Sequence, residues 1–137
     1  MKALSIINPW AHLIMYHGKN IENRSWRTDY RGRLLIHVSK KLMIDYKFLI
    51  SDLKSCCLLD KEKFQGIEGE EEFKQIEAEC GMILGSVVLY GCELGQYNVP
   101  WGDIGQWHWK LRDPIVFEKP IPARGSLGLW EYKWENV

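Results

Sequence analysis

Two runs of apolar residues, at 33–39 and 82–93, are the clearest hydrophobic features of the chain. Each has the length of a single strand, and β-branched Ile and Val, which favour extended backbone, recur in both. Weaker segments predict short strands at residues 3–7, 20–26, 106–111 and 115–117, and turns over 120–128. In the second of these strands, alternation places Glu22, Arg24 and Trp26 on one face.

Apolar residues at helical spacing predict three helices between these strands. The first follows Pro9, which a first helical turn tolerates, and ends at Gly18. The second is expected over residues 40–56 with Ser39 as its cap, and the third over the acidic residues 71–79. Five or more short strands with two or three helices predict an α+β fold, a small β-barrel with helices outside it.

The composition is that of a soluble globular protein. With 137 residues, 46% hydrophobic and 26% charged, the chain suits one compact domain and excludes a disordered or fibrous protein. Its apolar runs are too short to cross a bilayer, and no stretch resembles a secretory signal, so we expect a cytoplasmic protein without a membrane partner. The four cysteines contain no C-x-x-C pair and are expected to be buried free thiols in a reducing compartment.

The charge is sorted along the chain although its total is zero. Residues 19–41 carry seven basic and two acidic side chains, a net charge of +5. Residues 60–80 carry three basic and eight acidic side chains, a net charge of −5. We interpret the acidic block as a solvated face, and the basic block as a candidate binding surface.

Within the basic block, Lys19, Glu22 and Arg24 form the densest group of chemically useful residues. A carboxylate between two cations can do acid–base chemistry or stabilise an oxyanion. Glu22 would orient the cations, and the cations would keep its carboxylate ionised. From spacing alone, a surface ion pair that contributes little stability is the simpler interpretation.

The motifs around this trio follow a recognisable order. They are ALSI at 3–6, NPWA at 8–11, KNIENR at 19–24, YRG at 30–32, LLIHVSK at 34–40, GMILG at 81–85 and GSLGLW at 125–130. With them the chain resembles the ASCH family (activating signal cointegrator homology domains), which is related in fold to PUA domains. Lys19, Glu22 and Arg24 match the family's hallmark G-x-K-x-x-E-x-R, whereas His17 stands at the position of its glycine and Gly18 follows it.

The resemblance implies a small PUA-like β-barrel with peripheral α-helices and a cleft beside the K-x-x-E-x-R segment. Residues 1–137 would form a single ASCH/PUA-like domain, in which residues 41–80, where no motif matches, are a family-variable helical insertion. The family is linked to RNA or DNA recognition and to RNA metabolism. A smaller branch that resembles this fold hydrolyses the amide of N4-acetylcytidine, and some members are suggested to cleave RNA.

The first hypothesis is a module that binds RNA or another single-stranded nucleic acid, because the basic block is interleaved with aromatic residues. Cations would contact phosphates, and aromatic faces would stack on bases. The candidate binding residues are Trp10, Lys19, Asn23, Arg24, Trp26, Arg27, Tyr30, Arg31 and Lys40.

The second hypothesis is a metal-independent hydrolase acting on RNA or on a modified nucleoside, of the ribonuclease or N4-acetylcytidine amidohydrolase type. Glu22 would be the acid–base, and Lys19 and Arg24 would stabilise developing negative charge. The acetylcytidine branch carries Thr where this chain has Glu22, which argues against transferring that activity.

No cofactor or metal is expected, because the four histidines are scattered and lack paired ligand spacing. A third hypothesis is an interaction domain that uses the acidic segment 60–80 to hold a protein partner.

Overall fold

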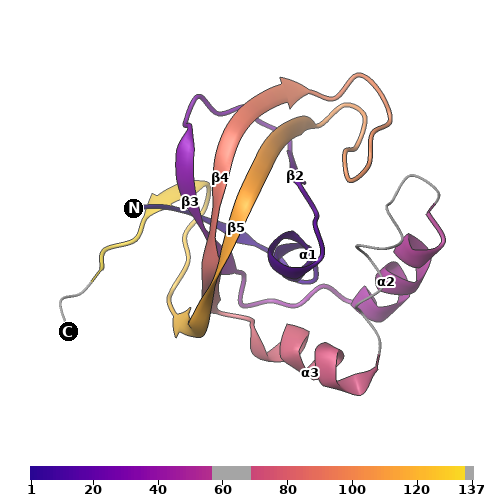
Figure 1. Ribbon diagram of the computed structural model, residues 1–137, viewed down its shortest axis with the longest axis vertical. Helices are drawn as coiled ribbons and strands as arrows, with labels where there is room; N and C mark the ends of the chain where they lie inside the picture. The colour runs from indigo at the N-terminus through magenta and orange to yellow at the C-terminus, as the bar shows by residue number, and fades with distance from the viewer. Residues whose placement is uncertain (57–68, 135–137) are drawn as a thin grey trace.

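The computed structural model describes residues 1–56 and 69–134, in which six strands form one curled sheet (Figure 1). The strands are β1 (Lys2–Ile6), β2 (Ile21–Arg24), β3 (Gly32–Val38), β4 (Met82–Leu94), β5 (Trp107–Pro122) and β6 (Leu129–Glu131). They lie in the order β2-β5-β4-β3-β1-β6, with β1 parallel to β3 and the other neighbours antiparallel. The sheet curls into half of a barrel, which confirms the predicted small PUA-like α+β fold.

The main core lies between this sheet and the first helix. In the described residues the helices are α1 (Trp10–Tyr16), α2 (Tyr46–Lys54) and α3 (Glu70–Ala78). The buried side of α1 packs Ala11, Ile14 and Met15 against one face of the sheet. Because successive strand residues point to opposite faces, Leu34 joins this core while Leu35 packs in a smaller cluster on the other face.

The second helix is shorter than predicted. It was expected over residues 40–56 but begins at Tyr46. Asp45 has a φ of 60°, a left-handed conformation that a right-handed helix cannot pass through. The Met43 amide instead donates a hydrogen bond to the Asn8 carbonyl, at 3.2 Å. The preceding residues are thus held against the start of α1, outside the helix.

A second core attaches α2 and α3 to α1. Leu13, Tyr46, Ile50 and Ile76 are buried together, and each comes from one of these three helices. Figure 1 shows α2 and α3 beside α1, away from the labelled N-terminus. The two helices therefore depend on α1 for their attachment to the sheet.

The strand β5 corrects the prediction of two strands and a turn-rich stretch. The segments expected at 106–111 and 115–117 belong to one strand of 16 residues, which continues to Pro122. Asp113 has a φ of 52°, and the pairing with β4 shifts register at three places. Pairing with the long strand β4 continues on both sides of Asp113-Pro114, so β5 does not end there. Local turn signals did not reveal this.

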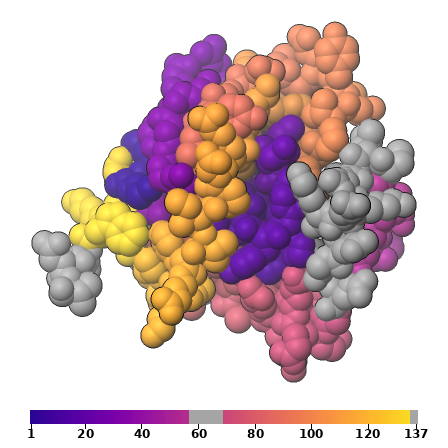
Figure 2. Space-filling view, viewed as in Figure 1, coloured from indigo at the N-terminus to yellow at the C-terminus, as the bar shows by residue number. Residues whose placement is uncertain are grey.

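The sequence also led to expectations for the cysteines, the acidic segment and membrane-spanning helices. Cys56, Cys80 and Cys92 are free as predicted but half-buried, and Cys57 lies outside the described residues. The first part of the acidic segment 60–80 also lies outside them, and its last part is α3, which borders the indigo N-terminal segment (Figure 2). Among the described residues, no helix is long and apolar enough to cross a membrane.

Candidate functional site

The K-x-x-E-x-R segment is positioned by β2 and by the tight connection from α1. The amides of His17 and Lys19 both donate to the Leu13 carbonyl, at 3.0 and 3.1 Å, which turns the chain at the end of α1. The following strand pairs with β5, so that Glu22 lies opposite Trp109 and Arg24 opposite Trp107. The predicted extended segment is confirmed, although it is shorter than residues 20–26.

The structure brings Lys19, Glu22 and Arg24 into one cluster. Arg24 Nε and Nη2 each lie 3.0 Å from Glu22 Oε2, and Lys19 Nζ lies 3.8 Å from Glu22 Oε1. Lys19 Nζ also donates to the Ile21 carbonyl, and Arg24 Nη2 donates to the Ser5 carbonyl at 2.9 Å. Lys19 is 3% exposed and Glu22 is 7% exposed, so the interpretation as a surface ion pair is wrong.

Burial dominates the electrostatics of Lys19. It lowers the pKa of the ammonium group, and the positive charge of Arg24 lowers it further, while Glu22 and Asp103 act in the opposite direction. The ammonium also faces the rings of Trp10 and Trp101, with Nζ 5.3 and 6.0 Å from their centroids. The cluster therefore contains an amine that gives up its proton more readily than a solvated lysine.

This cluster lines an open cleft of about 740 Å³. Six of the predicted site residues border it: Trp10, Lys19, Glu22, Asn23, Arg24 and Trp26. A second hollow of about 1050 Å³ lies beside it and includes Lys40 and Arg124 in its lining. The two hollows share Ser5, Ser39, Ser126 and Leu127, so they adjoin, and together they are called the groove below.

Trp26 and Asn23 shape the rim of the cleft. The exposed Trp26 ring stacks edge-on against buried Trp109, with centroids 4.7 Å apart, and the Trp26 carbonyl accepts from Trp109 Nε1. The Asn23 side chain binds the opposite rim, since Nδ2 donates to the Trp101 carbonyl and Oδ1 accepts from the Asp103 amide, both at 2.9 Å. The Trp26 ring thus remains partly exposed while both residues are held in place.

The remaining three predicted binding residues lie outside both hollows. Arg27 is exposed and pairs with Asp29 at 2.6 Å. The Tyr30 hydroxyl donates to the Arg33 carbonyl, and Arg31 donates to the carbonyls of Thr28 and Tyr30. The hydrogen bonds of Tyr30 and Arg31 stabilise the local turn before β3. The alternation of cations and aromatic residues in the sequence did not distinguish this turn from a binding surface.

Sequence reasoning missed a hydrogen-bonded chain at the join of the two hollows. Ser5 Oγ lies 2.8 Å from His37 Nδ1, and His37 Nε2 lies 2.7 Å from the Ala123 carbonyl. Because a carbonyl only accepts, Nε2 carries the proton and Nδ1 accepts from the Ser5 hydroxyl, which also receives a bond from Trp130 Nε1 at 3.1 Å. Ser5 and His37 are neighbours in the parallel β1–β3 register, and no local signal pairs residues this far apart.

Comparison with known proteins is consistent with this architecture. The sequence model of the family described as ASCH domain matches residues 4–121. Activating signal cointegrator 1 from human and the protein of the same name from mouse are each 28% identical to the chain over 134 residues. The match covers 93% of this chain but 22% of each relative, so the chain spans about a fifth of their length.

Proposed function

Because the chain belongs to the ASCH domain family, we propose that it binds RNA in the groove beside Lys19, Glu22 and Arg24, and thereby has a role in RNA metabolism. The observation that supports this best is a buried charged cluster that opens between aromatic faces. Single-stranded nucleic acid is recognised by cations along its backbone and by rings on which its bases stack.

The two hollows suit different parts of a nucleotide. In the cleft of about 740 Å³, the Glu22 carboxylate and the exposed Trp26 ring line the same space, an environment for the polar edge and the face of one base. In the neighbouring hollow, Lys40 and Arg124 offer positive charge for phosphates. Arg124 is a candidate binding residue that the sequence did not single out, because it lies outside the basic block.

Fluorescence anisotropy with a labelled single-stranded RNA tests this proposal. Base stacking contributes about 1–3 kcal/mol per base, so Trp26→Ala should weaken binding by roughly 5- to 150-fold. The matched control is Trp134→Ala, which removes an exposed indole that lines neither hollow. Equal loss in both variants, or affinity that does not change with salt, would refute binding in this groove.

Charge at the second hollow is tested in the same assay. Lys40→Ala should weaken binding for all RNA sequences alike, since phosphate contacts carry no sequence information. Arg27→Ala removes an exposed cation that is already paired with Asp29, and should leave affinity unchanged. A larger effect for Arg27 than for Lys40 would move the binding surface to the turn before β3.

A metal-independent hydrolase acting on RNA or a modified nucleoside is the second candidate. The specific observation in its favour is the buried Lys19 amine with its lowered pKa beside the Glu22 carboxylate. In RNA cleavage, Glu22 would take the proton of the 2′-hydroxyl as its oxygen attacks phosphorus, and the leaving 5′-oxygen would take a proton from a water molecule as its bond to phosphorus breaks. Lys19 and Arg24 would stabilise the charge of the intermediate.

Mass spectrometry of products decides between binding and hydrolysis. The protein is incubated in EDTA with N4-acetylcytidine or with a short structured RNA, beside a Lys19→Met variant that keeps the apolar stem. Product that forms with the wild type and is lost in the folded variant supports the enzyme. Intact substrates in both samples, with RNA binding retained, would leave binding as the function and rule out hydrolysis of these two substrates.

A further inference from the structure

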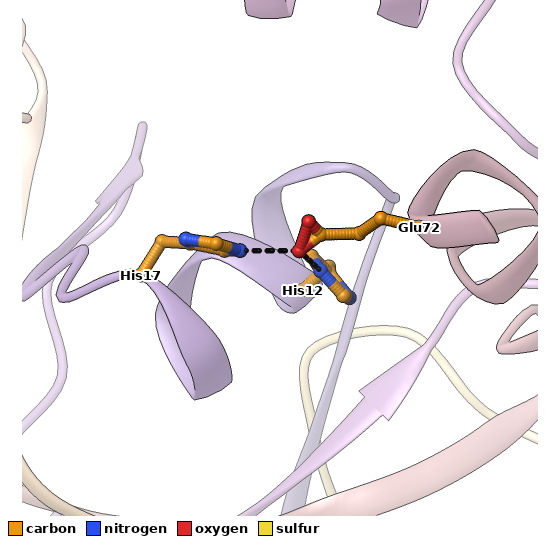
Figure 3. A group of neighbouring side chains, drawn as sticks. All are labelled: His12, His17 and Glu72. Carbon is orange, nitrogen blue, oxygen red and sulfur yellow. Dashed lines mark hydrogen bonds and ion pairs between the residues drawn. The ribbon is translucent and has the colours of Figure 1, made fainter. Parts of the chain in front are cut away.

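A second polar cluster, separate from the groove, joins α1 to α3. His12 lies within α1, His17 follows its last residue, and Glu72 comes from the first turn of α3. Figure 3 shows the Glu72 carboxylate between the two imidazole rings. The exposed fractions of the three side chains are 1% for His12, 6% for His17 and 18% for Glu72, so the cluster is largely shielded from water.

The three side chains present their ligand atoms to a common point. His12 Nε2 lies 3.4 Å and His17 Nε2 lies 2.8 Å from Glu72 Oε1. One atom from each residue can be chosen so that all lie within 4.8 Å of one another. Zinc bonds to imidazole nitrogen and carboxylate oxygen are about 2.0–2.2 Å long, which separates tetrahedral ligands by roughly 3.4 Å. Small side-chain movements would therefore admit an ion.

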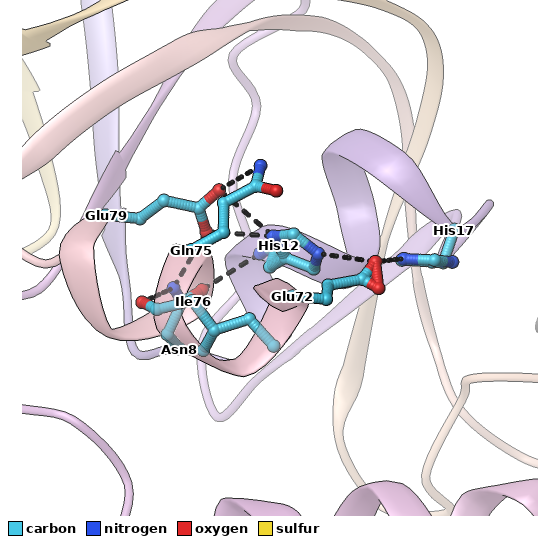
Figure 4. A network of polar contacts seen from close by, with 7 residues as sticks. All are labelled: Asn8, His12, His17, Glu72, Gln75, Ile76 and Glu79. Carbon is cyan, nitrogen blue, oxygen red and sulfur yellow. Dashed lines mark hydrogen bonds and ion pairs between the residues drawn. The ribbon is translucent and has the colours of Figure 1, made fainter. Parts of the chain in front are cut away.

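A second carboxylate, that of Glu79, holds His12 through its other ring nitrogen (Figure 4). His12 Nδ1 lies 2.9 and 3.0 Å from the two oxygens of Glu79, which also accepts bonds from Asn8 Nδ2 and Gln75 Nε2. A carboxylate only accepts, so Nδ1 carries a proton toward Glu79, and Nε2 would direct its lone pair at an ion bound beside Glu72. Metal-bound histidines are commonly held by such a carboxylate on their other nitrogen.

Glu72 supplies an independent observation that points to a ligand. Its Oε2 atom is buried and has no hydrogen-bond partner among the described residues. A buried acceptor without a partner is costly, and more so when it carries charge. When a metal ion replaces the protons between the rings and Glu72, the carboxylates of Glu72 and Glu79 contribute a formal charge of −2, which one divalent cation neutralises.

We propose that His12 Nε2, His17 Nε2 and the Glu72 carboxylate bind a divalent first-row transition metal ion of the zinc type. Two imidazoles and a carboxylate are a ligand set that Zn²⁺ accepts, with a fourth position left for water. The ion ties α3 to the end of α1, two residues before Lys19 enters the groove. The site was not visible in the sequence because Glu72 lies 55 residues beyond His17.

The first test uses the unaltered protein after chelator treatment and dialysis. Calorimetric titration with Zn²⁺ should show one saturable equivalent, and long-range ¹H–¹⁵N spectra should shift at Nε2 of His12 and His17 but not of His37 or His108. Co²⁺ should give visible d–d bands without the near-ultraviolet bands of a thiolate ligand. Absence of stoichiometric binding would overturn the proposal, as would thiolate bands or shifts confined to His37 and His108.

The second test compares three variants in α3 and just after it. Glu72→Gln removes a direct ligand and should abolish the rise in Tm that Zn²⁺ causes in the wild type. Glu79→Gln alters the group behind His12 and should weaken metal affinity by about 10- to 100-fold. Glu71→Gln is the matched control, because Glu71 is an exposed neighbour, and its affinity should equal the wild type's. Equal binding by all three variants would refute the assignment, and RNA binding measured in EDTA reports on the groove separately.

Discussion

Burial gives the Lys19, Glu22 and Arg24 cluster an energetic role that the surface ion pairs do not have. Its charges are taken out of water, so each depends on the others for stabilisation. The pair of Arg27 and Asp29 is shorter, at 2.6 Å, but stays exposed and screened. Arg24–Glu22 and Arg27–Asp29 both join an arginine to a carboxylate two residues away, and they differ in their surroundings.

Replacing Glu22 by Gln should destabilise the protein strongly. The change leaves the buried Lys19 and Arg24 without their shared carboxylate, and breaking a buried pair costs about 3–5 kcal/mol. The measurement is the free energy of unfolding in urea. Asp29→Asn is the control for an exposed pair, and it should change that free energy little. Similar losses in both variants would contradict the role of burial.

His37 should make stability depend on pH. Burial lowers its pKa, against the opposing hydrogen bonds of backbone groups, whereas in the unfolded chain it titrates near 6.5. Between the two values the unfolded chain binds more protons, so the free energy of unfolding should fall as pH drops below about 6.5. NMR titration of the His37 ring should give a pKa below 6.5, and His37→Gln should reduce this acid sensitivity. A pKa at or above 6.5 would contradict the prediction.

At the scale of elements, α1 connects all the functional features. One side of it packs on the sheet, and Leu13 on another side anchors α2 and α3. Trp10 at its start lines the cleft, and Lys19 follows just after its end. Displacing α1 would therefore disturb the core, the groove and the His12 cluster together.

The attachment of α3 should depend on Ile76. It is fully buried against Leu13 and α2, so Ile76→Ala should lower the free energy of unfolding by about 2–5 kcal/mol. Ile44→Ala deletes the same atoms from an exposed side chain and should change it by less than about 0.5 kcal/mol. Hydrogen exchange should show α3 amides losing protection first. Equal effects of the two substitutions would mean that the second core contributes little.

At the scale of the whole molecule, the balanced charge limits how nucleic acid can be held. A chain with a net charge of zero cannot rely on general attraction to a polyanion, so affinity must come from the groove. The proposed groove exposes few cations, among them Arg24, Lys40 and Arg124. We therefore expect recognition that rests more on stacking and shape than on phosphate contacts.

The salt dependence of RNA binding should accordingly be shallow. Two or three phosphate contacts correspond to a slope of log affinity against log salt of about −1.4 to −2.1 for a single strand. Anisotropy titrations between low and physiological salt measure this slope, and Lys40→Ala should reduce its magnitude by about 0.7. A slope steeper than about −4 would require a larger basic surface than the groove provides.

Local patterns were sufficient for part of the fold. The apolar runs of β3 and β4, the alternation of β2 and the spacing in α1 predicted these elements near their observed bounds, because side-chain periodicity is a property of neighbouring residues. Prediction from local patterns was wrong at Asp45, where a left-handed backbone delays the start of α2 to Tyr46. It was also wrong at Asp113, where β5 continues because it stays paired with β4. In both places contacts with distant residues outweighed local preference.

The motif residues and their family resemblance identified the charged trio, and residue types alone indicated its chemistry. The packing of distant segments decided the rest. It buried the trio and placed Arg27 and Arg31 outside the groove. It also brought Ser5 to His37 and His12 to Glu72. A sequence specifies which groups are available, whereas desolvation and distance, which set their energies and pKa values, arise only when the sheet and helices close around them.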